Sequence, residues 1–300
     1  MLKKPILMSA ILMAAATEAL AQAQPPEPIW KSGPDSIVVT SCAPGGDHDD
    51  SCRAVELRRG DNIVPLGSEF QSATLLWSRH PGQTGPDALV RGDFGGSGGL
   101  ADLFAVTVTP SLSIRKLSGE RMDELVAQPG PGPLRLTLPF DIEMFNGAPH
   151  GGATIVRLPI QWSGGDFSVD LAALTHRALS QDELDFRALA VKAELDQWAQ
   201  DVYPAPSLYP PKARSGTPVT VQALAELMLS GHADQARQLL HRAWPRSHER
   251  TNSPLGGEDG FWTALCQSVV GNASWKRFDL GRLPQADRIR TGAAGGSPPT

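Results

Sequence analysis

The sequence lacks several features that would place it in a broad functional class. It has only three cysteines and two tyrosines among its 300 residues, and its lysines and arginines form no basic block. With a formal net charge of −5, the chain offers little attraction for nucleic acid or for an anionic membrane. The phosphate-binding loop, the zinc-protease helix and the dinucleotide fingerprint are also missing, and we expect no cofactor.

Long apolar runs are equally scarce. After the N-terminal segment no stretch approaches the roughly 18 uninterrupted apolar residues of a spanning helix, so we expect no integral membrane segment. The residues that are present are typical of a folded chain, since 41% are hydrophobic and 20% are charged. Thirty glycines and 26 prolines predict short elements separated by frequent turns. The length favours about two domains.

Residues 1–23 have the pattern of a secretory signal peptide. Lys3 and Lys4 precede an apolar stretch at residues 5–16, and small-x-small cleavage patterns follow at residues 19–21 and 21–23. The apolar stretch is too short to cross about 30 Å of hydrocarbon. We therefore expect an exported protein, periplasmic or secreted, and a buried first helix is the alternative interpretation.

Two of the three cysteines flank a turn-forming loop between two strand-like runs, at residues 37–40 and 54–57. In an oxidising compartment Cys42 and Cys52 are expected to form a disulfide, which stabilises by roughly 2–3 kcal/mol on the chain-entropy model. The alternatives are unpaired thiols and a calcium or zinc site in this loop. Its ligands would come from Cys42, Asp47, His48, Asp49, Asp50 and Cys52. Cys266 shares a helical face with apolar residues, which favours a buried, inert thiol.

The period of the hydrophobic pattern changes once along the mature chain. Residues 24–170 alternate apolar and polar side chains between Gly/Pro breaks, which predicts about eight or nine short strands. No helical pattern separates these strands, so we expect an antiparallel sandwich or barrel rather than a parallel sheet. Residues 171–290 follow a helical period, and residues 291–300 have the composition of a disordered tail. The predicted class is α+β, with a β-rich domain followed by a helical domain.

The helical part has clear start and stop signals. Ser180 and Glu183 form a capping box that opens a helix ending near Gln200. Pro218 suits the first position of a second helix, and Gly231 suits its left-handed end. A further helix is expected over residues 233–243, and another over 259–270. The expected buried stripe of the first helix contains Leu184, Leu189, Val191, Leu195 and Trp198.

The C-terminal part carries two resemblances. Residues 224–245, with the turn GHAD at residues 231–234, resemble one helix-turn-helix unit of the tetratricopeptide type, although no second copy follows. With the downstream Phe261, Leu265 and Trp275, residues 165–280 resemble a set of uncharacterised exported bacterial proteins. That resemblance implies export and brings no activity with it.

A glycine-rich stretch at residues 92–103 carries two further motifs. It resembles a calcium-binding FG-GAP repeat, which implies oxygen ligands at Asp93 and Asp102, although Gly95 and Ser97 stand where other ligands are expected. It also contains Gly-Gly-Ser-Gly-Gly, which matches the G-x-S-x-G nucleophile elbow at Ser97. That motif requires a helix after the serine, whereas the following residues alternate as a strand.

Three functional hypotheses follow from the sequence. The first is an exported, non-catalytic protein-binding module of the cell envelope, whose partner is an envelope protein and whose helical hairpin presents a groove. The second is an envelope serine hydrolase that uses Ser97, with His150 from another Gly-rich loop. The third is a metal-dependent binding module that uses the Asp47–Asp50 loop or the Asp93 loop. Nothing in the sequence indicates the oligomeric state.

Overall fold

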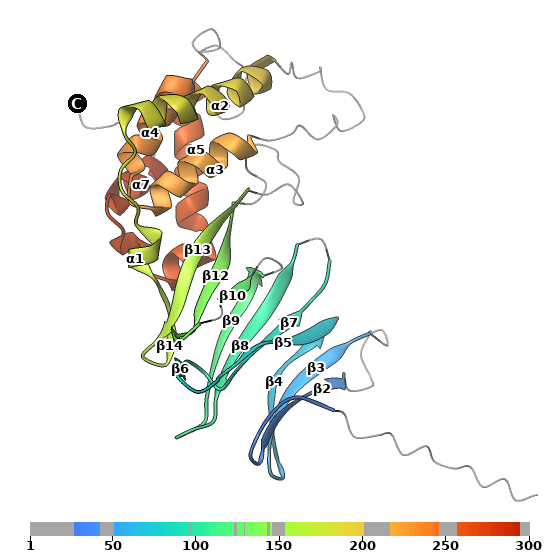
Figure 1. Ribbon diagram of the computed structural model, residues 1–300. Coiled ribbons are helices and arrows are strands. Elements are labelled where there is room, and N and C mark those ends of the chain that lie inside the picture. Colours follow the sequence, from blue (N-terminus) through green and yellow to red (C-terminus); the bar gives the residue numbers. More distant parts are fainter. Residues whose placement is uncertain are drawn as a thin grey trace, which may run out of the picture.

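The described part of the chain forms three four-stranded antiparallel sheets and one two-stranded parallel pair, together with a group of helices at the C-terminal end (Figure 1). The computed structural model describes residues 27–42, 51–96, 98–122, 125–128, 130–142, 145, 154–200, 217–245 and 257–294. The layers succeed one another in chain order, from the first sheet at one end to the helices at the other. This arrangement confirms the expected α+β class, with the β-rich part first.

The first sheet carries the disulfide. Its order is β1-β2-β3-β4, and β2 pairs with β3 through residues such as Thr40 and Ala54. Just beyond this pairing, Cys42 is bonded to Cys52 with 5.5 Å between their Cα atoms, which confirms the expected bridge. The strands are β1 (Pro28–Ser32), β2 (Asp35–Ser41), β3 (Arg53–Arg59) and β4 (Asn62–Phe70).

The second sheet is apolar on both faces. Along β8, Leu103 and Ala105 belong to one core cluster, whereas Phe104 and Val106 belong to the other. Because successive side chains of a strand point to opposite faces, this sheet has a core on each side. Its order is β5-β7-β8-β9. The strands are β5 (Ser72–Ser78), β7 (Ala88–Asp93), β8 (Leu100–Thr107) and β9 (Ser113–Arg121).

The third sheet buries one face and leaves the other partly open. Along β12, Leu136, Leu138 and Phe140 are buried, while Arg135 is exposed and Thr137 is half-buried. Its order is β10-β12-β13-β14. The strands are β10 (Val126–Gln128), β12 (Arg135–Ile142), β13 (Thr154–Ser163) and β14 (Asp166–Val169), and β6 (Gln83–Thr84) pairs in parallel with β11 (Gly132–Pro133).

The helices α2 to α5 lie where the sequence signals predict them, whereas α1, α6 and α7 were not predicted. Pro218 lies at the start of α3, and Gly231 ends the turn after α3 with a φ of 89°. The helices are α1 (Leu171–Leu174), α2 (Gln181–Gln200), α3 (Pro218–Leu229), α4 (Ala233–Ala243), α5 (Gly257–Gly271), α6 (Ala273–Arg277) and α7 (Ala286–Ala293). Within the described ranges, none of them combines the length and apolar character that crossing a bilayer requires.

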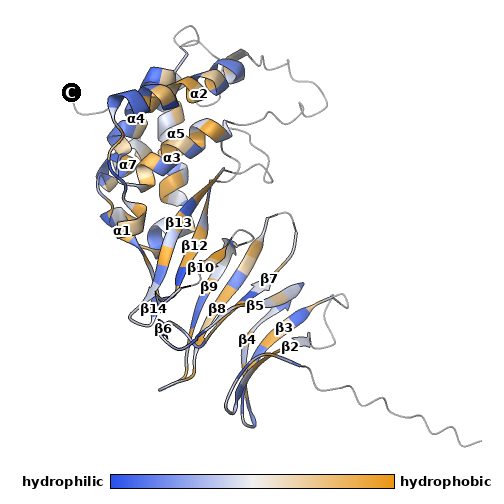
Figure 2. Cartoon of the chain, viewed as in Figure 1, coloured by the Kyte–Doolittle hydropathy of each residue, from blue (hydrophilic) through white to orange (hydrophobic). Residues whose placement is uncertain are grey.

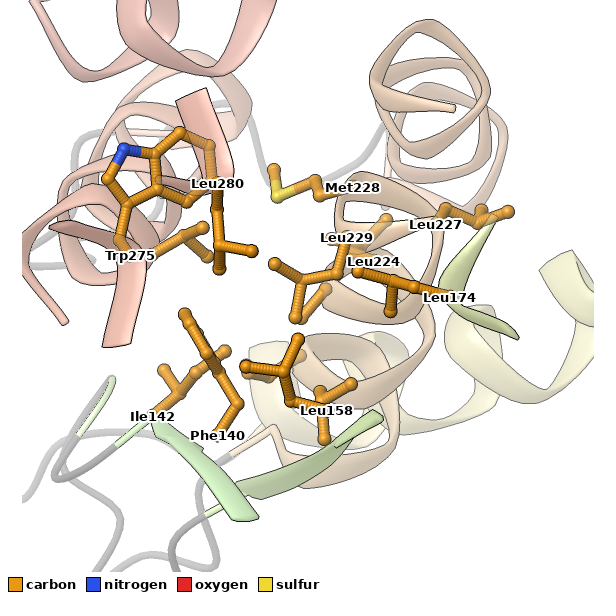
Figure 3. Close-up of a cluster of buried hydrophobic side chains, with 14 of the residues drawn as sticks. Phe140, Ile142, Leu158, Leu174, Leu224, Leu227, Met228, Leu229, Trp275 and Leu280 are labelled. Atoms are coloured by element: carbon orange, nitrogen blue, oxygen red, sulfur yellow. The ribbon is translucent and has the colours of Figure 1, made fainter. Parts of the chain in front are cut away.

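The helix α3 connects the helical layer to the third sheet. It packs on β13, on α2 and on α4, and Figure 2 shows that it is largely hydrophobic. In Figure 3, Phe140 and Leu158 of the sheet lie beneath Leu224 and Leu229 of this helix. All four side chains are fully buried, so the sheet and the helices share one core. The division into a β-rich domain at residues 24–170 and a helical domain at residues 171–290 stays a prediction.

A phenylalanine stacked on a glycine joins the first two sheets. The Phe70 ring is 1% exposed and lies so close to Gly92 that a Cβ built there would be 2.8 Å from it. Its centroid is 6.0 Å from that of Phe104, with the two rings close to perpendicular. The absence of a side chain at Gly92 therefore makes room for the aromatic ring that fills this interface.

Three expectations from the sequence need correction. Leu189 is 67% exposed rather than part of the buried stripe of α2, because the stripe consists of Leu184, Val191, Leu195 and Trp198. The helix α7 extends to Ala293, so residues 291–293 are helical rather than part of the expected disordered tail, and residues 295–300 lie outside the described residues. The described strands number fourteen, more than expected, because pieces as short as β6 show no alternation.

The helices α5 and α7 approach each other closely at Gly292. A Cβ built on this residue would lie 2.6 Å from Cys266 Sγ and 2.7 Å from Trp262 Nε1. Cys266 is fully buried, and burial raises the pKa of its thiol to about 12, in agreement with the inert thiol that the sequence predicts. The contact explains why a glycine occupies the last turn of α7.

We therefore expect Gly292→Ala to lower the free energy of unfolding by about 1–3 kcal/mol, because the added methyl group overpacks this contact. The measurement is urea denaturation of the mature protein. Gly271→Ala is the matched control, since a Cβ at that helical position meets no atom within 4 Å, and it should be neutral or slightly stabilising. Equal effects of the two substitutions would contradict the close-packing explanation.

Candidate functional site

The candidate site begins at an open edge of the third sheet. The strand β14 pairs only with residues 160–163 of β13, and one more bond joins the Asp170 N–H to the Pro159 carbonyl at 3.0 Å. Asp170 then caps α1, so the chain leaves the sheet. Alternation along β13 directs the backbone groups of Ile155 and Arg157 to the same edge. No strand in the described part of the chain pairs with it.

A reciprocal cap fixes the start of α2 beside this edge. The Ser180 N–H donates to Glu183 Oε2 at 2.7 Å, and the Glu183 N–H donates to Ser180 Oγ at 3.3 Å, which confirms the predicted capping box. The Arg177 guanidinium also donates to Glu183, at 2.8 Å. These bonds, chiefly the one from Arg177, lower the pKa of the Glu183 carboxyl to about 2. Arg177 is thereby held at the mouth of the site.

A carboxylate of α2 caps the start of α3. Glu194 accepts bonds from the backbone N–H groups of Val219 at 3.0 Å and Thr220 at 2.7 Å. It also accepts one from the Thr220 hydroxyl at 2.6 Å. The preceding residue, Thr217, makes no side-chain cap of its own. Because the first N–H groups of a helix have no partner inside it, this long-range cap fixes α3 against α2.

The connection between α1 and α2 is fixed to α4 in the same way. Gln235 exchanges two bonds with the Leu179 backbone, accepting from its N–H at 2.9 Å and donating to its carbonyl at 2.8 Å. His232 Nε2 lies 2.7 Å from the His176 carbonyl oxygen, so this ring nitrogen must carry the hydrogen. The wall of the site is therefore built from elements that are joined by hydrogen bonds, namely the α1–α2 connection and the start of α4.

These elements enclose a cavity of about 470 Å³ between β13, the α1–α2 connection and α3. Its floor consists of buried apolar side chains, namely Leu174, Leu227 and Leu229. Exposed polar side chains, including Arg157 and His176, form its rim. The cavity has the size of known small-molecule sites, together with their combination of an apolar interior and a few polar groups.

The rim of the cavity is cationic. Arg177 is paired with Glu183, and Arg187 lies 3.6 Å from Glu226. Arg157 makes no ion pair and no side-chain hydrogen bond among the described residues. Among the described residues, three guanidinium groups at the rim therefore face two carboxylates, and the positive charge of Arg157 has no counter-ion.

An apolar groove of about 440 Å³ lies next to the cavity, between α2 and α3. Phe186 of α2 is 76% exposed at this groove, and Val219 of α3 is 48% exposed. The exposed Leu189 lies here as well. Residues Arg187, Gln222 and Glu226 line both the groove and the cavity.

The structure leaves most of the sequence-derived site residues outside its described ranges. Those residues are Asp47, His48, Asp49, Asp50, Ser97 and His150. The strands on either side of Ser97 are described, and β7 pairs with β8 as an antiparallel hairpin. A nucleophile elbow needs a helix after the serine, so the G-x-S-x-G match lies in the wrong structural context.

The two carboxylates of the calcium motif do not share one site. Asp102 pairs with Gly92 across the hairpin, whereas Asp93 pairs with Ala101. Because facing residues point to the same side of a sheet, the Asp93 and Asp102 side chains lie on opposite faces. Each has its own cation, Arg91 at 2.9 Å and Lys116 at 2.7 Å respectively. Nowhere in the described ranges do three His, Cys, Asp or Glu side chains gather as a metal site.

Sequence reasoning missed the cavity and the groove. The cavity depends on residues from β13, α2 and α3 that lie far apart in the sequence, and no local motif marks them. The groove did have a signal. Phe186 lies two positions after Leu184, and two positions along a helix is a turn of about 200°, so it had to face away from the buried stripe.

Comparisons with known proteins add no further information on this site. No protein-family model, no curated protein and no solved structure matches the chain. The resemblance to uncharacterised exported proteins therefore stays a prediction from the sequence.

We expect Glu194→Ala to lower the free energy of unfolding by about 1–2 kcal/mol, because it leaves the first N–H groups of α3 without their acceptor. Urea denaturation measures this change. The control is Asp196→Ala, which removes an exposed pair with Lys192 at 2.9 Å on the same helix and should change stability by less than about 0.5 kcal/mol. A loss for Glu194→Ala no larger than the control would contradict the capping role.

Proposed function

We propose that this is an exported protein-binding module of the cell envelope, which acts by binding a partner protein through the groove between α2 and α3. The observation that carries the proposal is the exposure of Phe186, Leu189 and Val219 at one groove. Single exposed apolar residues are common on protein surfaces, whereas several lining one groove are typical of an interaction site.

The chemistry of the groove favours an apolar segment of the partner. The polar side chains at its edge already have partners within the protein, because Glu226 pairs with Arg187 and accepts a hydrogen bond from Gln222 Nε2 at 3.1 Å. A partner therefore meets mainly Phe186, Leu189 and the small side chain of Ala223. An amphipathic helix that places its apolar face in this groove fits such a surface.

Two observations support the exported location. The N-terminal residues have the signal-peptide pattern, although they lie outside the described residues. The Cys42–Cys52 disulfide is of the kind that persists in oxidising compartments and is rare in the cytosol. Both observations fit an envelope or extracellular protein.

The groove can be tested with a photo-reactive amino acid at Leu189 in the intact chain, expressed in the native host. We expect irradiation to give one discrete adduct with an envelope protein, and we expect Phe186→Ser to remove it, because the substitution takes away most of the apolar contact area. Gel electrophoresis followed by mass spectrometry measures the adduct.

The same probe at Ile63, which is 58% exposed on β4, serves as the control. It should give no such adduct, since it lies far from the helices. The same adduct from both positions, or none from Leu189, would refute the proposal. An adduct between two copies of this chain would also overturn it, because it would assign the groove to self-association.

Export has a separate test in the mass and thiol content of the mature protein. We expect the isolated periplasmic protein to begin at Gln22 or Gln24, after one of the two cleavage patterns. Under denaturing, non-reducing conditions only Cys266 should react with an alkylating reagent, because the other two cysteines are bridged. N-terminal sequencing and intact mass give both results. A retained Met1, or three reactive thiols, would contradict export.

A further inference from the structure

We propose that the cavity beside β13 binds a small molecule that carries one carboxylate on an aliphatic body, with Arg157 as its anchor. The cavity and the α2–α3 groove are separate volumes that share only Arg187, Gln222 and Glu226. This ligand site is therefore additional to the protein-binding surface and does not depend on it.

The charges at the rim favour a monoanion. Arg177 and Arg187 already have carboxylate partners, so the Arg157 guanidinium is the cation that a ligand can neutralise. A guanidinium binds a carboxylate through two parallel N–H bonds. The open β13 edge adds the backbone N–H groups of Ile155 and Arg157 as further donors on the same side. A dianion would meet only one unmatched positive charge here.

The interior favours an aliphatic body. Leu174, Leu227 and Leu229 are each at most 5% exposed and form the floor beneath the polar rim. Ser230 is a buried polar residue that also lines the cavity, and its hydroxyl already donates to the Leu227 carbonyl at 3.2 Å. A ligand would therefore place its chain on the leucines and its carboxylate at the rim.

Titration of the mature protein with octanoate, followed by calorimetry, tests this assignment. We expect one site for octanoate and much weaker binding of both octanol and octylamine, which have the same chain without the negative charge. Arg157→Gln should weaken octanoate binding roughly tenfold or more, because it removes a charge-assisted pair. Ile155→Trp should abolish binding by filling the cavity. The thermal melting temperature verifies that each variant is folded.

Two control variants locate the ligand. Lys31→Gln removes an exposed cation on β1, in the first sheet, and should leave octanoate binding unchanged. Leu189→Ser alters the groove and should also leave it unchanged. Equal binding of octanol and octanoate would overturn the role of the carboxylate. Loss of octanoate binding in the Leu189 variant would overturn the assignment to the cavity, and so would equal losses of binding in the Arg157 and Lys31 variants. If the unmodified protein does not bind octanoate, the proposal is wrong.

Discussion

The need to cover apolar sheet faces governs the whole structure. The strand β8 is apolar on both sides, so the second sheet must be covered on one side by the first sheet, and its other face belongs to the core shared with the third sheet and the helices. The third sheet then buries Phe140 and Leu158 against α3. Each layer thus supplies a surface that the next layer in the chain covers, and this explains why spatial order follows chain order.

The parts of the fold that the sequence predicts are those that depend on local chemistry. Alternation in residues 134–140 predicts β12, and the Ser180–Glu183 box predicts the start of α2, because both signals involve neighbouring residues. The Cys42–Cys52 bridge was predictable because a hairpin brings its two ends together. In contrast, β6 and β11 have two residues each and are set by pairing between distant segments, so no periodicity reveals them.

The candidate site was not predictable for the same reason. Its defining contacts are long-range, such as Glu194 with Thr220 and Gln235 with Leu179, and a sequence alone does not show which segments meet. Leu189 illustrates the difficulty. An apolar residue on an amphipathic helix is usually assigned to the core, yet this one faces the groove, because the narrower stripe that ends at Trp198 already fills the space against the core.

The shared core also decides how the function must be tested. Deletion of residues 217–300 is a poor test of binding, because it would expose Phe140 and Leu158, which Leu224 and Leu229 now cover. Exposing these side chains to water would lose about 1.5–3 kcal/mol each, and the loss of partner binding would then report unfolding rather than recognition. Surface substitutions at Phe186 and Arg157 leave that core intact, so their effects on binding can be attributed to the groove and to the cavity respectively.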